Sequence, residues 1–237
     1  MVVMGESTVE GGPWLLNKED RWPDVLAQLI DRSQAKPVEY HNKGIGANAI
    51  SPRSPGYPDS AKPSALERYR EDVIDLEPDL LILCYGLNDM RAGMEVDDFA
   101  EDMTTIIRDV EDACSPVTVL TTVYHMTGWR SYPPYDRGSP ELTERYNRAI
   151  TELAEENNCI LSDVWDAEGC ADWLINPDGV HANFVGNLVI GHRVFRDLAV
   201  NCSCLAEETL ARTMDTEWVT NTSASREEAG DPFRKTW

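Results

Sequence analysis

Five short apolar runs alternate along the chain with segments of helical periodicity. The runs are β-branched or aliphatic and bounded by turn residues, and they cover residues 1–4, 38–42, 79–85, 117–123 and 160–164. The segments between them carry apolar residues at helical spacing, as in residues 99–110. Because parallel strands need a helix-length connection, this alternation predicts a five-stranded parallel sheet with helices on both faces, a three-layer α/β/α fold.

Several sequence signals mark where helices begin. Ser64 and Glu67 form a capping-box pattern ahead of an apolar-periodic segment. The pair Ser139-Pro140 opens a later segment, because proline is favoured in the first helical turn. A last helix is predicted from the apolar residues Phe184, Val185, Leu188, Val194, Phe195 and Leu198.

The 237 residues fit a single α/β domain, which we place over residues 1–200. From about residue 201 the sequence becomes polar and only weakly periodic. We therefore expect residues 201–237 to form a C-terminal extension that is packed on the domain or partly disordered.

The chain is strongly acidic, with 42 acidic against 21 basic residues and a formal net charge of -21. Such a surface repels polyanions, so we expect neither nucleic acid nor an anionic membrane as a partner. The composition fits a high-salt habitat or an ordinary acidic protein equally well. No stretch is apolar enough to span a bilayer, and the first residues lack the features of a signal peptide. We expect a cytoplasmic protein, or a secreted one if the chain is a mature or trimmed form.

The segment NPDGVHAN places Asp178 and His181 three residues apart, just before a predicted helix. A carboxylate at this spacing can hold one imidazole nitrogen and leave the other free as a general base. Taken alone the pattern is weak, since such an Asp is more often a helix cap and such a His more often a surface or core residue.

Three loops that follow predicted strands carry further polar groups, and in parallel sheets ligands bind outside these strand ends. Ser7 occupies the turn after the first strand, where its hydroxyl can project over the sheet edge. The segment HNKGIGAN provides a glycine-bearing turn after the second strand, and YGLND places the amide of Asn88 after the third. Each of these is also compatible with an ordinary turn or helix cap.

Taken in order, four segments resemble the conserved blocks of the SGNH hydrolases, also called GDSL-type esterases or lipases. The segment GES around Ser7 resembles the nucleophile block, NKGIGAN the glycine block, YGLND the asparagine block and DGVH the histidine block. The resemblance covers roughly residues 1–200. It implies a flavodoxin-like α/β/α fold and a Ser7, His181 and Asp178 triad that needs no metal or cofactor.

The resemblance also implies an oxyanion hole and leaves one member of it open. The expected donors are the backbone N–H of Ser7, the side-chain amide of Asn88 and a backbone N–H from the second block. A gap-free match puts Ala47 where the family usually has glycine, with Gly46 one residue earlier. Glu6 likewise replaces the usual Asp beside the nucleophile. The elbow Gly-x-Ser-x-Gly of α/β-hydrolases fits less well, because Val9 occupies its last position.

These residues predict a serine-dependent carboxylic ester hydrolase acting on a small ester, with a short-chain or acetyl-carbohydrate ester favoured over a long-chain lipid. Trp129, Tyr132 and Tyr135 are candidate substrate contacts, although packing of a long loop explains them equally well. His125 is a weaker candidate in the same segment. An acyltransferase, a thioesterase and a catalytically inactive carbohydrate-binding module are the alternatives.

Overall fold

The computed structural model describes residues 1–205, so the predicted extension over residues 201–237 lies almost entirely outside the described residues. A five-stranded sheet forms its centre, in the order β2-β1-β3-β4-β5, and all neighbouring strands are parallel. The strands are β1 (Val2–Gly5), β2 (His41–Gly44), β3 (Leu80–Cys84), β4 (Val117–Thr121) and β5 (Ile160–Ser162). This order is the flavodoxin-like one, and it confirms the predicted fold class.

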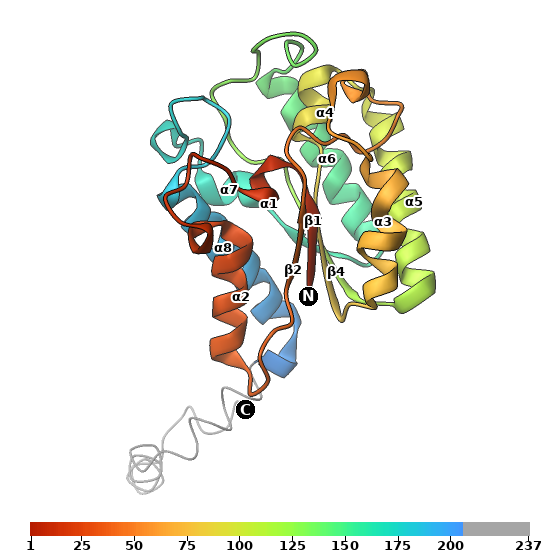
Figure 1. Cartoon of the computed structure of the whole chain (residues 1–237), viewed down its shortest axis with the longest axis vertical. Coiled ribbons are helices and arrows are strands. Elements are labelled where there is room, and N and C mark those ends of the chain that lie inside the picture. Colours follow the sequence, from red (N-terminus) through yellow and green to blue (C-terminus); the bar gives the residue numbers. More distant parts are fainter. Residues whose placement is uncertain (206–237) are drawn as a thin grey trace, which may run out of the picture.

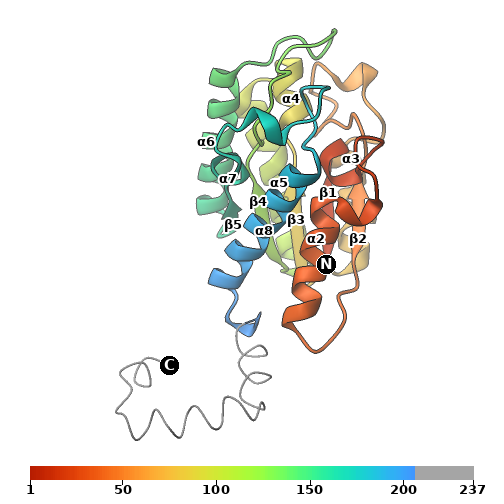
Figure 2. The same cartoon turned by 90° about the vertical axis from the view of Figure 1, so that its left-hand side faces the viewer.

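Helices cover both faces of the sheet. Figure 1 shows α2, α7 and α8 on one side and α3, α5 and α6 on the other, and Figure 2 shows α2 and α8 lying side by side across one face. The α-helices are α1 (Ser7–Glu10), α2 (Trp22–Ser33), α3 (Ala65–Asp72), α4 (Leu87–Ala92), α5 (Val96–Cys114), α6 (Pro140–Glu156), α7 (Val164–Glu168) and α8 (Phe184–Asn201). Short 3₁₀ turns lie at η1 (Lys18–Asp20), η2 (Tyr57–Asp59), η3 (Ile74–Leu76) and η4 (Asp172–Leu174).

The core lies where the central strands meet the helices. Val3 and Ile82, which are paired in register on β1 and β3, are both fully buried. The predicted apolar face of α5 is buried along its whole length, from Phe99 to Val110. The capping box of Ser64 and Glu67 is present at the start of α3, as the sequence predicts. The central strands are thus stabilised by burial of continuous apolar runs. The helices are stabilised by burial of one apolar face and by capping of their ends.

Strand β2 begins three residues later than the apolar run predicts. The parallel ladder opens with His41 beside Val2, and the N-terminal amino group donates to the carbonyl oxygen of Glu39 at 2.7 Å. Val38 and Tyr40 therefore pack against the core from the connection that precedes the strand. The apolar run therefore corresponds mainly to the buried connection that precedes this edge strand, and not to the residues that pair with β1.

The predicted apolar face of α8 is only partly correct. Val194 and Leu198 are buried, but Phe184 and Val185 in the first turn are about half exposed, at 50% and 51%. Helix α8 instead approaches α2 closely at a glycine: a Cβ on Gly191 would lie 2.9 Å from the carbonyl oxygen of Trp22. Close helix approach through glycine carries no hydrophobic signal, which is why the periodicity misplaces this face. Among residues 1–205, no helix is both long and apolar enough to cross a membrane.

Candidate active site

The candidate site lies at the carboxyl ends of β1 and β3, the two central neighbours in the sheet. The chain leaves β1 toward α2 on one face and leaves β3 toward α5 on the other (Figure 1). A crevice opens at such a switch point, because the two connections diverge. Ser7 is the first residue of α1 and Asn88 the second residue of α4, so both side chains lie at this crevice.

Ser7, His181 and Asp178 form a continuous chain of hydrogen bonds. Ser7 Oγ lies 2.9 Å from His181 Nε2, and His181 Nδ1 lies 2.8 Å from Asp178 Oδ2. The nucleophile comes from the start of the chain and the other two residues from the loop before α8. The structure thus brings together the three residues predicted to form the triad, with the relative positions that nucleophile, base and orienting carboxylate need.

The carboxylate of Asp178 is held by its own loop. Its Oδ1 accepts the backbone N–H groups of Val180 at 2.8 Å and of His181 at 2.9 Å. Burial acts to raise the pKa of Asp178, but these two N–H donors and the imidazole outweigh it and lower the pKa below its usual value. Asp178 is therefore ionised at neutral pH and fixes the imidazole by its Nδ1 side.

The imidazole of His181 is largely enclosed. The indole of Trp14 stacks on it with ring centroids 3.6 Å apart and planes 10° from parallel. Burial lowers the pKa of His181, Asp178 partly opposes this effect, and the positive charge of Arg91 adds to the lowering. A neutral imidazole whose Nε2 faces a serine hydroxyl is the state that a general base requires.

The turn that presents Ser7 is tightly constrained. A Cβ on Gly5 would lie 2.5 Å from Val9 Cγ2 and 2.6 Å from the Cys84 carbonyl oxygen, so only glycine fits there. The next side chain, Glu6, is buried, and its Oε1 accepts the backbone N–H of Asn88 at 3.0 Å. Glu6 therefore connects the turn after β1 to the turn after β3. This connection is present although glutamate replaces the usual Asp at this position.

Asn88 is oriented by a buried asparagine, Asn48, that no sequence pattern marks as a site residue. Asn88 Nδ2 donates to the backbone carbonyl of Asn48 at 3.0 Å, which leaves its second N–H available to the cleft. The side-chain amide of Asn48 is itself anchored to the carbonyls of Ala61 and Pro63, at 2.9 and 2.8 Å. The long loop between β2 and α3 thereby fixes the amide of Asn88.

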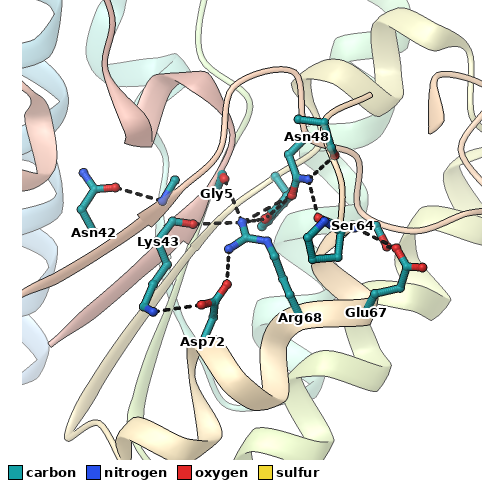
Figure 3. A network of polar contacts seen from close by, with 12 residues as sticks. Gly5, Asn42, Lys43, Asn48, Ser64, Glu67, Arg68 and Asp72 are labelled. Carbon is teal, nitrogen blue, oxygen red and sulfur yellow. Dashed lines mark hydrogen bonds and ion pairs between the residues drawn. The ribbon is translucent and has the colours of Figure 1, made fainter. Parts of the chain in front are cut away.

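Arg68 on α3 holds this arrangement from below, at the centre of the polar network in Figure 3. Its Nη2 lies within hydrogen-bond distance of the carbonyls of Gly5 and Lys43, at 3.3 and 2.9 Å, and of Asn48 Oδ1 at 3.4 Å. Its Nη1 pairs with Asp72 at 2.6 Å. One guanidinium thus joins the ends of β1 and β2 to the residue that orients Asn88.

The two candidate donors of the second block differ in what they contact. Gly46 N–H donates to Glu10 Oε2 at 2.7 Å. The backbone N–H of Ala47 has no hydrogen-bond partner among the residues that the structure describes. Ala47 lines the cleft and adopts a left-handed conformation with φ 53°. The free donor is therefore the backbone N–H of Ala47, the residue that stands where the family usually has glycine.

These residues open into a cleft of about 690 Å³. Trp14 and Glu10 line it, as do Arg91, Tyr132 and Tyr135. Tyr132 is 68% exposed at the rim, whereas Tyr135 is buried in the wall. Of the three candidate substrate contacts, Tyr132 and Tyr135 thus reach the cleft.

Trp129 and His125 lie outside the lining of this cleft. Trp129 packs edge-on against His125 with ring centroids 5.9 Å apart, and His125 Nε2 lies 2.8 Å from Asp172 Oδ1. His125 also packs edge-on against Trp165 of α7, with ring centroids 5.6 Å apart, so both rings are packed away from the cleft.

The sequence patterns do not identify several residues that line the cleft, among them Trp14, Glu10, Arg91 and Ser131. The proximity of Trp14 and Glu10 to Ser7 along the chain was a usable signal, because the loop after the first strand must border the crevice. Arg91 stands three residues after Asn88 on one helix, so both side chains share a face. The hydrogen bond from Asn88 to Asn48 involves a backbone carbonyl and has no sequence signal.

The described part of the chain offers no cluster of three or more His, Cys, Asp or Glu side chains arranged to hold a metal ion. The cysteines are all free, and Cys84 is buried beside Thr8 with an Sγ to Oγ1 distance of 3.6 Å. Burial raises the pKa of the Cys84 thiol to about 11, so at neutral pH it is a neutral core side chain.

Comparison with protein families gives one match, to the model of the GDSL-like lipase/acylhydrolase family over residues 3–188. Comparison with curated proteins gives no significant match. The family match spans all four segments that carry Ser7, Gly46, Asn88 and His181.

Solved structures similar to this chain share its fold at low sequence identity. A lipase/acylhydrolase from Enterococcus faecalis has a TM-score of 0.66 and 19% identity, covering 84% of this chain and 95% of that one. The acetylxylan esterase Axe2 from Geobacillus stearothermophilus has a TM-score of 0.62 and 18% identity, with 83% and 92% covered. TesA has a TM-score of 0.67 and 15% identity, with 83% and 96% covered.

Proposed function

Because the chain belongs to the GDSL-like lipase/acylhydrolase family, we propose that it hydrolyses short-chain carboxylic esters with Ser7 as the nucleophile. One observation carries the proposal: the hydrogen-bonded chain from Ser7 Oγ through His181 to Asp178, with distances of 2.9 and 2.8 Å, on the wall of a cleft. A serine hydroxyl is a weak nucleophile unless an adjacent base accepts its proton, and this arrangement supplies that base.

In the acylation step, Ser7 Oγ attacks the ester carbonyl carbon while His181 Nε2 accepts the hydroxyl proton. Asp178 stabilises the imidazolium that forms, since its carboxylate already accepts from Nδ1 at 2.8 Å. The imidazolium then protonates the leaving alkoxide, and the alcohol departs. An acyl group remains on Ser7.

The negative charge that develops on the carbonyl oxygen is stabilised by three donors. These are the backbone N–H of Ser7, the free side-chain N–H of Asn88 and the backbone N–H of Ala47. Gly46 is the weaker candidate, because its N–H already donates to Glu10 at 2.7 Å. Donors fixed before the reaction cost no reorganisation when the charge appears, so they favour the transition state over the ground state.

Deacylation repeats the chemistry with water as the nucleophile. His181 accepts a proton from water as the water oxygen attacks the acyl carbon, and the same donors stabilise the second oxyanion. The proton then returns to Ser7 Oγ as the carboxylic acid leaves. The neutral state of the imidazole, favoured by its burial, serves both steps.

We propose that the substrate combines a short acyl group with a polar alcohol such as a sugar. Tyr132 and Tyr135 offer flat apolar rings with polar edges, which suit carbohydrate rings. The fold similarity to an acetylxylan esterase is consistent with an acetylated carbohydrate, although at 18% identity it supports the fold and not the substrate.

The test is the hydrolysis of a p-nitrophenyl ester series, from acetyl to dodecanoyl, by the wild type, Ser7→Ala and Ser33→Ala. Ser33 lies in the last turn of α2 and lines no part of the cleft, so its variant controls for loss of a serine hydroxyl. We expect turnover that falls with chain length, is abolished in Ser7→Ala and persists in Ser33→Ala. Equal turnover by a folded Ser7→Ala would refute the triad. Acyl transfer to added alcohol in place of water would identify a transferase.

A further inference from the structure

Arg91 brings a positive charge into the cleft. It lies on α4 three residues after Asn88, so the two side chains share one helix face, and both line the cavity that holds Ser7 and His181. Only 6% of Arg91 is exposed, which is unusual for a charged residue. The same charge acts on His181, where it contributes to lowering the pKa of the imidazole.

The guanidinium of Arg91 has no carboxylate partner among residues 1–205. Its Nη2 donates to Ser131 Oγ at 2.8 Å, and its buried Nε has no hydrogen-bond acceptor. Arg68, the comparable buried arginine on α3, pairs with Asp72 at 2.6 Å. In a chain with twice as many acidic as basic residues, a buried arginine left without an ion pair is the exception.

The acidic groups of the cleft are already engaged elsewhere. Glu10 Oε2 accepts Gly46 N–H at 2.7 Å, and Asp178 pairs with His181 at 2.8 Å. The hydroxyl of Tyr135, which lies beneath Arg91 with the guanidinium carbon 5.7 Å from the ring centroid, is also buried without a partner. Two donor groups on one wall thus lack an acceptor, and an uncompensated buried charge is costly.

We propose that Arg91, oriented by Ser131 and flanked by Tyr135, forms a subsite for a carboxylate carried by the ester substrate. The inference rests on the proposed function, because it places the carboxylate on an ester whose carbonyl carbon meets Ser7. A planar guanidinium binds a carboxylate with paired hydrogen bonds, which are strong where water is excluded. The carboxylate belongs either to the acyl group, as in a half-ester of a dicarboxylic acid, or to the alcohol, as in an acetylated acidic sugar.

Two matched substrate pairs test the subsite and distinguish these sources. p-Nitrophenyl hemisuccinate against p-nitrophenyl butyrate places the carboxylate on the acyl side, and 4-acetoxybenzoate against its methyl ester places it on the alcohol side. The measured quantity is the ratio of kcat/KM for the charged and neutral member. Comparing this ratio between variants cancels the different intrinsic reactivities of the esters.

We expect Arg91→Gln to lower the ratio roughly ten- to hundred-fold for one of the two pairs, as for loss of a hydrogen bond between charged groups. Arg91→Lys keeps the positive charge but cannot donate the paired hydrogen bonds of a guanidinium. Its kcat/KM ratio is expected to lie between those of the wild type and Arg91→Gln. Arg137→Gln is the matched control, since it removes the same charge from an exposed neighbour that lines no part of the cleft. An unchanged ratio in Arg91→Gln for both pairs overturns the proposal while leaving ester hydrolysis established.

A binding measurement keeps the two proposals separable. Calorimetric titration compares Ser7→Ala with Ser7→Ala/Arg91→Gln, both of which lack the nucleophile, using two amides: 4-acetamidobenzoate, whose carboxylate is on the leaving-group side, and N-phenylsuccinamic acid, whose carboxylate is on the acyl side. We expect at least a tenfold loss of affinity in the double variant for one of the two amides; failure of both amides to bind, or equal binding of both amides by the two variants, overturns the subsite. If no ester is hydrolysed at all, the proposed function fails and this titration still decides the role of Arg91. Should Arg91→Gln not fold, Ser131→Ala, which removes the acceptor that orients the guanidinium, takes its place in both assays.

Discussion

The indole of Trp14 lies flat on the imidazole of His181, with centroids 3.6 Å apart and planes 10° from parallel. Trp14 follows the nucleophile by seven residues, while His181 belongs to the loop before α8. The stacked pair therefore closes one side of the cleft by joining the first and last segments of the site. It also excludes water from the general base, and desolvation is the largest cause of the lowered pKa of His181.

The pH dependence of hydrolysis should report this desolvation. Because the neutral imidazole is the active form and its pKa is lowered from 6.5, kcat/KM in the wild type should rise with pH through a midpoint below 6.5 and then level off. In Trp14→Ala the imidazole regains water, so the midpoint should move upward. The measurement is kcat/KM for p-nitrophenyl acetate between pH 4.5 and pH 9 at constant ionic strength.

Trp173→Ala is the control for this profile, because the side chain of Trp173 is 79% exposed on the surface and does not contact His181. Its profile should coincide with that of the wild type. A midpoint in Trp14→Ala that stays in place, or that falls, would show that the stacked indole does not set the basicity of His181.

Asn88 should act mainly in the transition state. Removing its side-chain donor in Asn88→Ala is expected to lower kcat roughly 100- to 1000-fold, about 3 to 4 kcal/mol, with little change in KM. Asn88→Asp replaces the donor by an acceptor of the same shape and should be at least as impaired. A loss confined to KM would instead assign Asn88 to substrate binding, and steady-state kinetics on p-nitrophenyl acetate distinguish the two cases.

The sequence predicts the layers of the fold and misses how some elements meet. Parallel strands buried on both faces leave continuous apolar runs, and this signal yields the sheet and most of its strands. It fails at β2, where the ladder residues His41–Gly44 are polar and only half buried. It also fails at α8, whose contact with α2 depends on the absence of a side chain at Gly191.

In the candidate site, too, the sequence predicts some residues and misses others. Side chains that do the chemistry, such as Ser7, Asn88 and His181, stand in recognisable patterns after strands. Groups that position them through the backbone do not, as with the carbonyl of Asn48 that holds Asn88. The choice between Gly46 and Ala47 depends on where the Glu10 carboxylate lies, a three-dimensional fact that block spacing does not contain.

Glu6 should matter as a hydrogen-bond acceptor and not as a charge. Burial and the nearby Asp89 raise the pKa of Glu6 well above its usual value, while its Oε1 accepts Asn88 N–H at 3.0 Å. Glu6→Gln keeps an acceptor oxygen and should retain most of kcat. Glu6→Ala leaves the buried N–H of Asn88 without its partner, which costs about 1 to 3 kcal/mol of stability, and kcat should fall with it. Chemical denaturation and p-nitrophenyl acetate kinetics on both variants test this, and equal effects of Gln and Ala would contradict it.

Glu168 should make folding stability depend on pH. Burial raises the pKa of Glu168 to about 8, although its Oε2 accepts the backbone N–H of His125 at 2.8 Å. Between the usual carboxyl range and pH 8 the folded protein therefore holds a proton that the unfolded chain has released. The free energy of unfolding must then fall as the pH rises through this window.

Glu168→Gln removes the titrating carboxyl from the folded and the unfolded state. It therefore removes the contribution of this group to the pH dependence of the free energy of unfolding. Near pH 5 the buried carboxyl is protonated and similar in shape to glutamine, so the two proteins should be about equally stable. By pH 8 the variant should be the more stable, by on the order of a few kcal/mol, and the difference should level off at higher pH. Urea denaturation at fixed ionic strength from pH 5 to pH 9 measures the difference. A constant difference across this range would mean that Glu168 titrates alike in the folded and unfolded states, whereas a difference that grows with pH identifies it as a proton-binding group of the folded core.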